Sequence, residues 1–299
     1  MNNPTLILPE KLALLENLTG QLSATPGVKA VVLGGSYARG RQNPASDLDI
    51  GIYYSDAAPF AIDDIRRIAA HAVPAAAGAA AGNATVTGFY EWGPWVNGGA
   101  WLHTPAGKVD FLYRSLDKVE KTIQEAMAGT TYFDFYQQPP YGFYSVIYLA
   151  ETHICLPLYD PQGHLARLKQ MVAVYPPALK RKVIAEQLWI AEFTLSNAAG
   201  FAAKGDLYDT AGCLTRSASC LTQALFALNE SYFITDKTAM AEIAAFPLAP
   251  RGYVEQLGAI LAHPGQTPAE LTATVSSLRS AWQAVVTLAG SLYQPMFNL

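Results

Sequence analysis

The spacing of apolar and polar residues in the first third of the chain predicts both helices and strands. Leucines recur at helical spacing in "PEKLALLENLTGQLSATPG" (9–27), and Pro26-Gly27 ends that helix. A second helix is predicted for "AIDDIRRIAAHAV" (61–73), followed by a helix end and loop in the alanine- and glycine-rich 74–84. Strands are predicted for "VKAVVLGG" (28–35), "DLDIGIYY" (47–54), "TVTGFYEW" (85–92), "AWLHT" (100–104) and "KVDFLYRSL" (108–116).

From about Leu116 onward the pattern becomes that of helices separated by glycine, proline and asparagine. The predicted helices lie within 116–129, 141–155, 164–175, 178–205, 207–233, 238–246 and 268–292. This change of pattern predicts an α+β chain. Its N-terminal domain, residues 1–115, has a mixed sheet flanked by helices, and an all-α helical-bundle domain follows at residues 116–299.

Composition narrows the classes of function. The formal net charge is −4 and the pI is about 5.7, which argues against an extended nucleic-acid surface. Cys155, Cys213 and Cys220 lie in apolar surroundings and are expected to be free thiols. We find neither a signal peptide nor an apolar run long enough to cross a membrane. We therefore expect a cytoplasmic protein with no membrane or nucleic-acid partner; the sequence does not indicate its oligomeric state.

The segment "GGSYARGRQNPASDLDIGI" (34–52) contains the residues with the clearest chemical pattern. Side chains two apart on a strand point to the same face, so Asp47 and Asp49 are predicted to lie side by side. Leu48 and the isoleucines that follow then face a core. Two carboxylates so close repel each other unless a cation lies between them. The pattern therefore predicts a bound divalent metal.

The order of these features resembles the signature of the DNA polymerase beta-like nucleotidyltransferase superfamily. The signature comprises the strand "AVVLGGS", the helix start "ARG", and "SDLDIGI" after a ten-residue spacer, 37–46. A third carboxylate is expected on a later strand, and Asp110 in "KVDFLYR" supplies it. The resemblance covers about residues 28–114, and the long helical half resembles that of bacterial aminoglycoside-nucleotidyltransferase-like members.

The chemistry of nucleotidyl transfer fits these residue types. Charge develops on the attacking oxygen, the phosphorus centre and the leaving pyrophosphate, and Mg²⁺ held by Asp47, Asp49 and Asp110 would stabilise it. Asp110 would also assist removal of the acceptor proton. The remaining candidates would bind phosphate through bare backbone, a hydroxyl or a guanidinium. They are Gly34, Gly35, Ser36 and Arg39, with Arg41 as a further possibility.

Other residues are weaker candidates. Glu91, at the end of a predicted strand, resembles the glutamate that serves as general base in antibiotic-modifying members, as an alternative to Asp110. Trp92, Trp95 and Trp101 would line an acceptor pocket or pack in the interior. His103 lies close in sequence to Asp110, but a packed or solvent-facing histidine is the ordinary interpretation.

The resemblance further implies that the helical domain closes the active-site cleft, with a lysine or tyrosine touching the triphosphate. Lys204 and Tyr208 are the candidates, although Lys204-Gly205 also has the character of a helix C-terminus.

The predicted function is Mg²⁺-dependent transfer of an NMP, expected to be AMP from ATP, to a hydroxyl of a small molecule such as an aminoglycoside-like antibiotic. Two alternatives stay open: a nucleotidyltransferase that modifies a protein hydroxyl, and a catalytically inactive nucleotide-binding regulatory module. Retention of all three carboxylates favours an enzyme over the inactive module.

Overall fold

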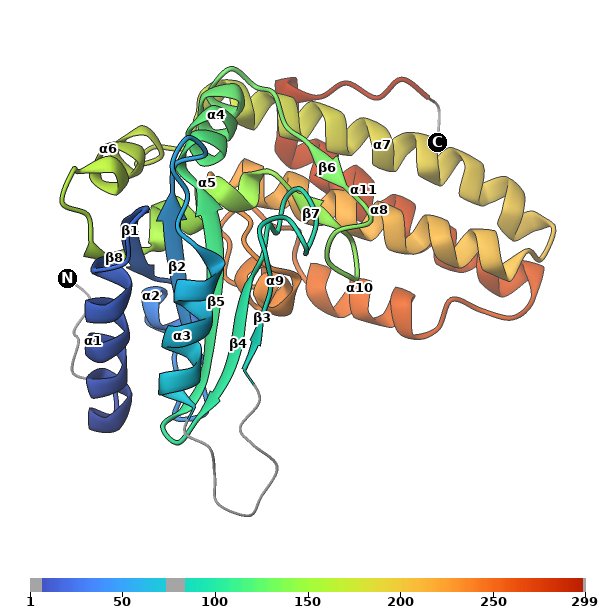
Figure 1. Ribbon diagram of the computed structural model, residues 1–299. Helices are drawn as coiled ribbons and strands as arrows, with labels where there is room; N and C mark the ends of the chain where they lie inside the picture. Colours follow the sequence, from blue (N-terminus) through green and yellow to red (C-terminus); the bar gives the residue numbers. More distant parts are fainter. Residues whose placement is uncertain (1–6, 74–83, 298–299) are drawn as a thin grey trace, which may run out of the picture. The chain divides into compact units, whose positions relative to one another are not determined.

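The computed structural model describes residues 7–73 and 84–297 (Figure 1). The chain divides into two compact units. The sheet unit comprises Met1–Gln124, Phe133–Gln138 and Gly142–Val174, and the helical unit comprises Glu125–Tyr132, Pro139–Tyr141 and Tyr175–Leu299. These units are defined by contacts and extend the sheet unit beyond the predicted bound at residue 115. The functional division into 1–115 and 116–299 stays a prediction.

The sheet unit is built on six strands in the order β3-β4-β5-β2-β1-β8. The strands are β1 Val28–Leu33, β2 Leu48–Tyr54, β3 Thr85–Val86, β4 Gly99–Thr104, β5 Gly107–Ser115 and β8 Leu156–Tyr159. β2 and β5 pair in parallel, whereas the other pairs are antiparallel. The sheet is therefore mixed, as the sequence predicts.

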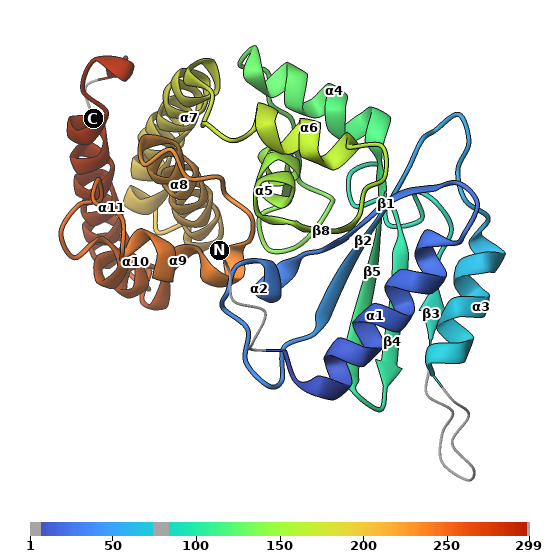
Figure 2. The same cartoon turned by 90° about the vertical axis from the view of Figure 1, so that its left-hand side faces the viewer.

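One face of this sheet, here called the core face, is covered by α1 (Pro9–Ser23) and α3 (Ile62–Ala72), as both views show (Figures 1 and 2). The core face carries alternate residues of the strands, including the fully buried Ile50 and Phe111. Leu18 of α1 and Ile65 of α3 pack against them. Period-two burial on strands and a leucine stripe on α1 thus produce one closed apolar layer.

The opposite face, here called the acidic face, carries Asp49 and Asp110, which alternate with the buried core residues. The shorter elements of the sheet unit are α2 Gly35–Ala38, α5 Val146–Ile154, α6 His164–Met171 and the strand pair β6 Phe133–Asp134 with β7 Phe143–Tyr144. α4 Leu116–Met127 begins directly after β5.

The helical unit is built around the antiparallel helices α7 and α8, joined by a short turn at Gly205, whose φ is +76°. Its helices are α7 Pro177–Ala203, α8 Leu207–Leu228, α9 Asp236–Ile243, α10 Tyr253–Ala262 and α11 Pro268–Ala289, followed by the 3₁₀ turn Gly290–Leu292. Leu188, Leu221 and Trp282 are buried in its core, and the Trp282 indole N–H donates to the Leu188 carbonyl. The C-terminal region is helical, as predicted.

Local differences separate the structure from the predicted elements. The predicted strand at 85–92 is limited to Thr85–Val86, because the chain then turns, with positive φ at Tyr90, Gly93 and Asn97. Helix α10 and strands β6, β7 and β8 were not among the predicted elements, and β7 lies within the helix predicted at 141–155. The predicted helix end and loop at 74–84 lies almost entirely outside the described residues. Within the described part, no helix is long and apolar enough to cross a membrane.

Candidate active site

The centre of the site is a pair of aspartates on neighbouring parallel strands. Asp49 of β2 is in register with Asp110 of β5, and both are half-buried on the acidic face. Adjacent strands lie about 4.8 Å apart, so the two carboxylates emerge next to each other. Asp47 directly precedes β2 and is two residues from Asp49, which favours the same side of the strand. The predicted alternation with a buried Leu48 and Ile50 is confirmed.

The glycine loop at the end of β1 lies against Asp49. The Gly34 N–H donates to the Asp49 carbonyl at 2.8 Å. Gly35 has a φ of +57°, and a Cβ placed on it would lie 1.7 Å from Asp49 Oδ2. A residue with a side chain therefore cannot stand at Gly35 unless the Asp49 carboxylate moves. The backbone of the glycine loop is therefore in close contact with the Asp49 carboxylate.

The rest of the predicted phosphate-binding set follows this loop. Ser36 lies in the short helix α2, and Arg39 is its C-terminal cap; both side chains are half-buried. Tyr37 and Ala38, between them, are buried and anchor the turn in the core. Arg41 is exposed, and its N–H donates to the Ser36 carbonyl at 3.0 Å. The other predicted loop residues thus follow Gly34 and Gly35, the two that lie against Asp49.

Lys11 holds the segment that leads to Asp47, a role that the sequence analysis did not predict. Only 4% of Lys11 is exposed, and its Nζ donates to the carbonyls of Pro44 at 2.9 Å and Ser46 at 2.6 Å. A signal was present: Lys11 precedes Leu15 by four residues and falls on the buried stripe of α1. A lysine at such a position needs oxygen partners, and two carbonyls supply them.

A pair of stacked indoles lies on the other side of Asp110. Trp101 of β4 is the register partner of Asp110 and is 48% exposed. The Trp92 ring stacks on Trp101 with centroids 4.6 Å apart and an interplanar angle of 21°. Trp92 also covers Gly99, where a Cβ would lie 2.9 Å from its Cζ3. The two rings therefore lie on the acidic face, and Trp101 keeps much of its surface open.

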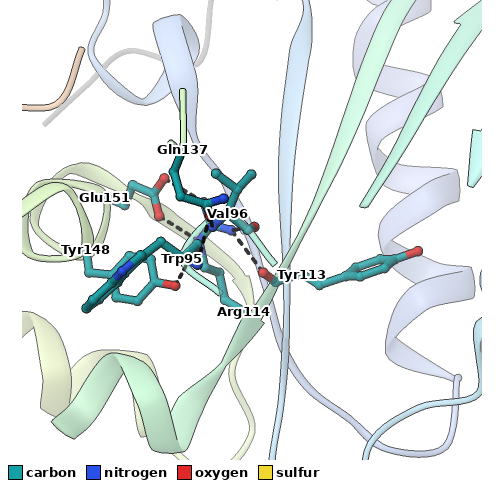
Figure 3. A network of polar contacts seen from close by, with 7 residues as sticks. All are labelled: Trp95, Val96, Tyr113, Arg114, Gln137, Tyr148 and Glu151. Carbon is teal, nitrogen blue, oxygen red and sulfur yellow. Dashed lines mark hydrogen bonds and ion pairs between the residues drawn. The ribbon is translucent and has the colours of Figure 1, made fainter. Parts of the chain in front are cut away.

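A polar network fixes the loop that carries Trp92 (Figure 3). Arg114 projects from β5 and forms a two-pronged ion pair with Glu151 of α5, with both N–H···O distances 2.8 Å. Its Nη1 also donates to the Val96 carbonyl at 3.0 Å. Burial alone would lower the pKa of the Arg114 guanidinium, but the Glu151 carboxylate more than offsets this, and the pKa lies above its usual value. Arg114 thus stays charged while it holds the loop.

Two further contacts complete the network in Figure 3. The Tyr148 hydroxyl donates to the Trp95 carbonyl at 2.5 Å, and Gln137 Oε1 accepts from the N–H groups of Trp95 at 3.1 Å and Val96 at 3.2 Å. The Trp95 ring stacks on Phe143 and lies 4.4 Å from Lys118 Nζ. Burial lowers the pKa of Lys118. Trp95 is therefore an anchor of the loop, in contrast to Trp101.

Glu91 is not brought beside the aspartates by any contact among the described residues. It lies in the turn after β3 rather than at a strand end, and it is exposed. Burial raises the pKa of the Tyr113 phenol, and the Glu91 carboxylate adds to this. His103 is exposed opposite Lys108 on the same sheet. The choice between Asp110 and Glu91 as general base stays a prediction.

Lys204 and Tyr208 belong to the helical unit. Lys204 is the C-terminal cap of α7, and its backbone N–H bonds within that helix end. Tyr208 is 88% exposed and lines a pocket of about 990 Å³ between α7 and α8, with Phe193, Asn197 and Arg216 among its other lining residues. Lys204 thus ends a helix and Tyr208 lines a pocket within the helical unit. Their contact with a triphosphate stays a prediction.

The described residues contain no group of three or more histidine, cysteine, aspartate or glutamate side chains arranged to hold a metal ion. The donor set at Asp49 and Asp110 is nevertheless of the kind that Mg²⁺ uses, because this ion is commonly held by one or two carboxylates together with substrate phosphates. The pair therefore fits a metal that arrives with a nucleoside triphosphate.

Comparison with known proteins bears on each unit. Residues 148–237 match a domain of unknown function, DUF4037. A crystal structure of a nucleotidyltransferase-like protein from Exiguobacterium sibiricum 255-15 shares 9% identity and aligns over 93% of this chain and 76% of its own, at a TM-score of 0.46. No curated protein matches the chain. Residues 15–77, which carry the glycine loop, Asp47 and Asp49, match the nucleotidyltransferase domain family.

Proposed function

We propose that this chain is a metal-dependent nucleotidyltransferase that moves AMP from ATP to a hydroxyl group of a small molecule. The proposal rests chiefly on one observation: Asp49 is in register with Asp110 and lies against the bare backbone of Gly35. The match of residues 15–77 to the nucleotidyltransferase domain supports NMP transfer in general. The choice of AMP and the nature of the acceptor are our proposals.

The chain's own residues would divide the work between the two sides of the aspartate pair. The amide groups of Gly34 and Gly35, the Ser36 hydroxyl and the Arg39 guanidinium would bind the phosphates beside Asp49. Asp110 would accept the proton of the acceptor hydroxyl. The acceptor oxygen forms a bond to the α-phosphorus while the bond to the β-phosphate bridging oxygen breaks, and pyrophosphate leaves.

Asp49 and Asp110, with Asp47 next to them, would hold Mg²⁺. When bound, this ion supplies charge neutralisation for the phosphate oxygens and lowers the pKa of the attacking hydroxyl. The two carboxylates lie on neighbouring strands about 5 Å apart, and a divalent cation between them would offset the repulsion between their charges. The site is thus expected to bind ATP much more tightly with Mg²⁺ than without it.

An aminoglycoside-like molecule is the acceptor that we propose, in keeping with the resemblance of the two-part chain to antibiotic-modifying nucleotidyltransferases. A cationic acceptor suits the carboxylates of the acidic face. Modification of a protein hydroxyl and nucleotide binding without turnover would both appear in the same experiment as binding without pyrophosphate release.

The test is calorimetry with each of the four NTPs and Mg²⁺, followed by pyrophosphate release in the presence of aminoglycosides. We expect Mg²⁺-dependent ATP binding and release with at least one acceptor. The double variant Asp47→Asn with Asp49→Asn should lose turnover while its circular dichroism spectrum and melting temperature stay near those of the parent. Turnover by this variant would overturn the assignment of both aspartates. Binding without release for every small acceptor would favour a protein acceptor or the inactive module.

A further inference from the structure

We infer that the stacked pair Trp92 and Trp101 is the binding surface for the acceptor, and that this acceptor presents a saccharide ring. The inference rests on the proposed function and adds to it the side from which the acceptor enters. Neither the nucleotidyltransferase match, which ends at residue 77, nor the match at 148–237 includes these two residues.

The order of the strands separates a phosphate side from an acceptor side. β1, β2, β5 and β4 are successive neighbours in the sheet. The glycine loop leaves β1, Asp49 lies on β2, Asp110 on β5 and Trp101 on β4. With about 4.8 Å between strands, Trp101 is about 10 Å from the strand of Asp49 and farther still from the strand that leads to the glycine loop.

The geometry of phosphoryl transfer turns this order into a direction. The attacking and leaving oxygens lie roughly in line on opposite sides of the phosphorus. If the triphosphate binds at Gly34–Ser36, pyrophosphate departs on the β1 side. The acceptor hydroxyl must then approach over Asp110, and the body of the acceptor comes to rest on the next strand, where Trp101 stands.

The indole pair is held in place before any ligand binds. Trp92 stacks on Trp101 and covers Gly99, so its ring has little room to turn. The Trp92 N–H donates to the Asn97 carbonyl at 2.8 Å, and the buried Asn97 side chain donates to the Tyr54 hydroxyl at 2.8 Å. Arg114 secures the adjacent Val96. A preorganised aromatic surface loses little conformational entropy when it binds a ligand.

The chemistry of the surface selects a saccharide ring. A flat indole offers apolar area to the C–H face of a sugar, while the reacting hydroxyl at the ring edge finds the Asp110 carboxylate as acceptor. The same face also carries His103 and Lys108 toward the β4–β5 turn, where a cationic group would be disfavoured. Amino groups are therefore expected to point away from that turn.

The experiment compares three variants by saturation-transfer NMR and titration calorimetry on the full chain with Mg²⁺ and a non-hydrolysable ATP analogue. The ligands are kanamycin, streptomycin, glucosamine, N-acetylglucosamine and adenosine. We expect Trp101→Ala to weaken binding of an aminated saccharide about tenfold and Trp101→Phe to retain most of it. Trp189→Ala is the matched control, because Trp189 is also an exposed indole stacked on an aromatic ring, that of Phe193 in the helical unit.

Each outcome decides something. Loss of saccharide binding in Trp101→Ala, with the affinity for the ATP analogue unchanged, supports the inference. A loss of ATP-analogue affinity instead would mean that the indoles bind the base, and would overturn it. Unchanged saccharide binding, or no saccharide binding to a parent protein that binds ATP, would also overturn it while the proposed function stands. Failure of the parent to bind any NTP would overturn the proposed function itself.

Discussion

The two faces of one sheet differ in what their side chains do, although the same strands supply both. On the core face, Ile50 and Phe111 are completely buried beneath α1 and α3. Their immediate neighbours Asp49 and Asp110 stand half-buried on the acidic face. Successive residues of a strand point to opposite faces, so each of these buried core residues is adjacent in the chain to an aspartate of the acidic face. Substitutions at adjacent positions should accordingly separate loss of stability from loss of function.

The sharpest test substitutes two adjacent residues of β5, one at a time. Asp110→Asn should reduce nucleotidyl transfer about 10²–10⁴-fold, because it removes the group that we propose takes the acceptor proton, with little change in melting temperature. Phe111→Ala should lower the free energy of unfolding by about 3–5 kcal/mol through the cavity it leaves. Pyrophosphate release and urea denaturation measure the two effects. A destabilised Asp110→Asn, or a stable Phe111→Ala, would break the distinction between the faces.

The next largest effect is expected at Gly35. Its positive φ makes Gly35→Ala cost about 1–2 kcal/mol of stability, and its new Cβ displaces the Asp49 carboxylate. A displacement of about 1 Å at a reacting group can lower turnover about 100-fold. Gly40→Ala is the control, since Gly40 has a similar φ of +65° but no atom within 4 Å of the added Cβ. Equal loss of turnover in both variants would contradict the contact with Asp49.

Near the C-terminal end of β5, the acidic face carries the buried Arg114 in an ion pair with Glu151. Glu151→Gln leaves the buried guanidinium without its anion and should cost about 3 kcal/mol in the free energy of unfolding, measured with urea. The control is Glu120→Gln, which removes an ion pair with Arg167, a side chain that is 49% exposed. That change should cost less than about 1 kcal/mol. Similar values for the two variants would mean that the network in Figure 3 does not hold the loop.

The smallest effect concerns pH. Burial raises the pKa of the Cys155 thiol, next to α5, to about 11 from an ordinary value near 9.0. The unfolded chain releases this proton first, so the stabilisation is complete below pH 9 and is lost as the pH rises toward 11. Cys155→Ala should make the decline in melting temperature over this range shallower.

Cys213, which is partly exposed, should react with a thiol reagent before Cys155 and Cys220. Equally fast reaction of Cys155 and Cys220 would contradict their burial.

Local features of the sequence predicted much of the sheet unit. The alternation in "DLDIGIYY" predicted the burial of Leu48, Ile50 and Ile52, although Tyr53 on the opposite face is buried as well. The glycines were predicted to bare the backbone for phosphate, and the structure shows Gly35 against Asp49. Strand alternation and glycine placement depend on residues close together in the chain, so a single sequence is enough to predict them. The assignment of chemical roles to Asp47, Asp49 and Asp110 stays a prediction.

Features that depend on distant residues could not be predicted. Nothing local indicates that β2 and β5, about 60 residues apart, pair in parallel register. The turns at 88–97 interrupt an apolar run that otherwise resembles a strand, and Glu91 consequently lies in a turn and is exposed. Helix α10 was missed because Gly258 interrupts its apolar pattern and a proline-rich segment precedes it.

Lys11 has a practical consequence for anyone who shortens this chain. The family match spans residues 15–77, so a fragment cut to those limits would lack both Lys11 and Asp110. Without the lysine ammonium, the carbonyls of Pro44 and Ser46 lose the donor that holds them beside the first helix. The segment before Asp47 would then depend on its own short-range bonds. A fragment that keeps the segment before Asp47 in place should therefore begin before Lys11.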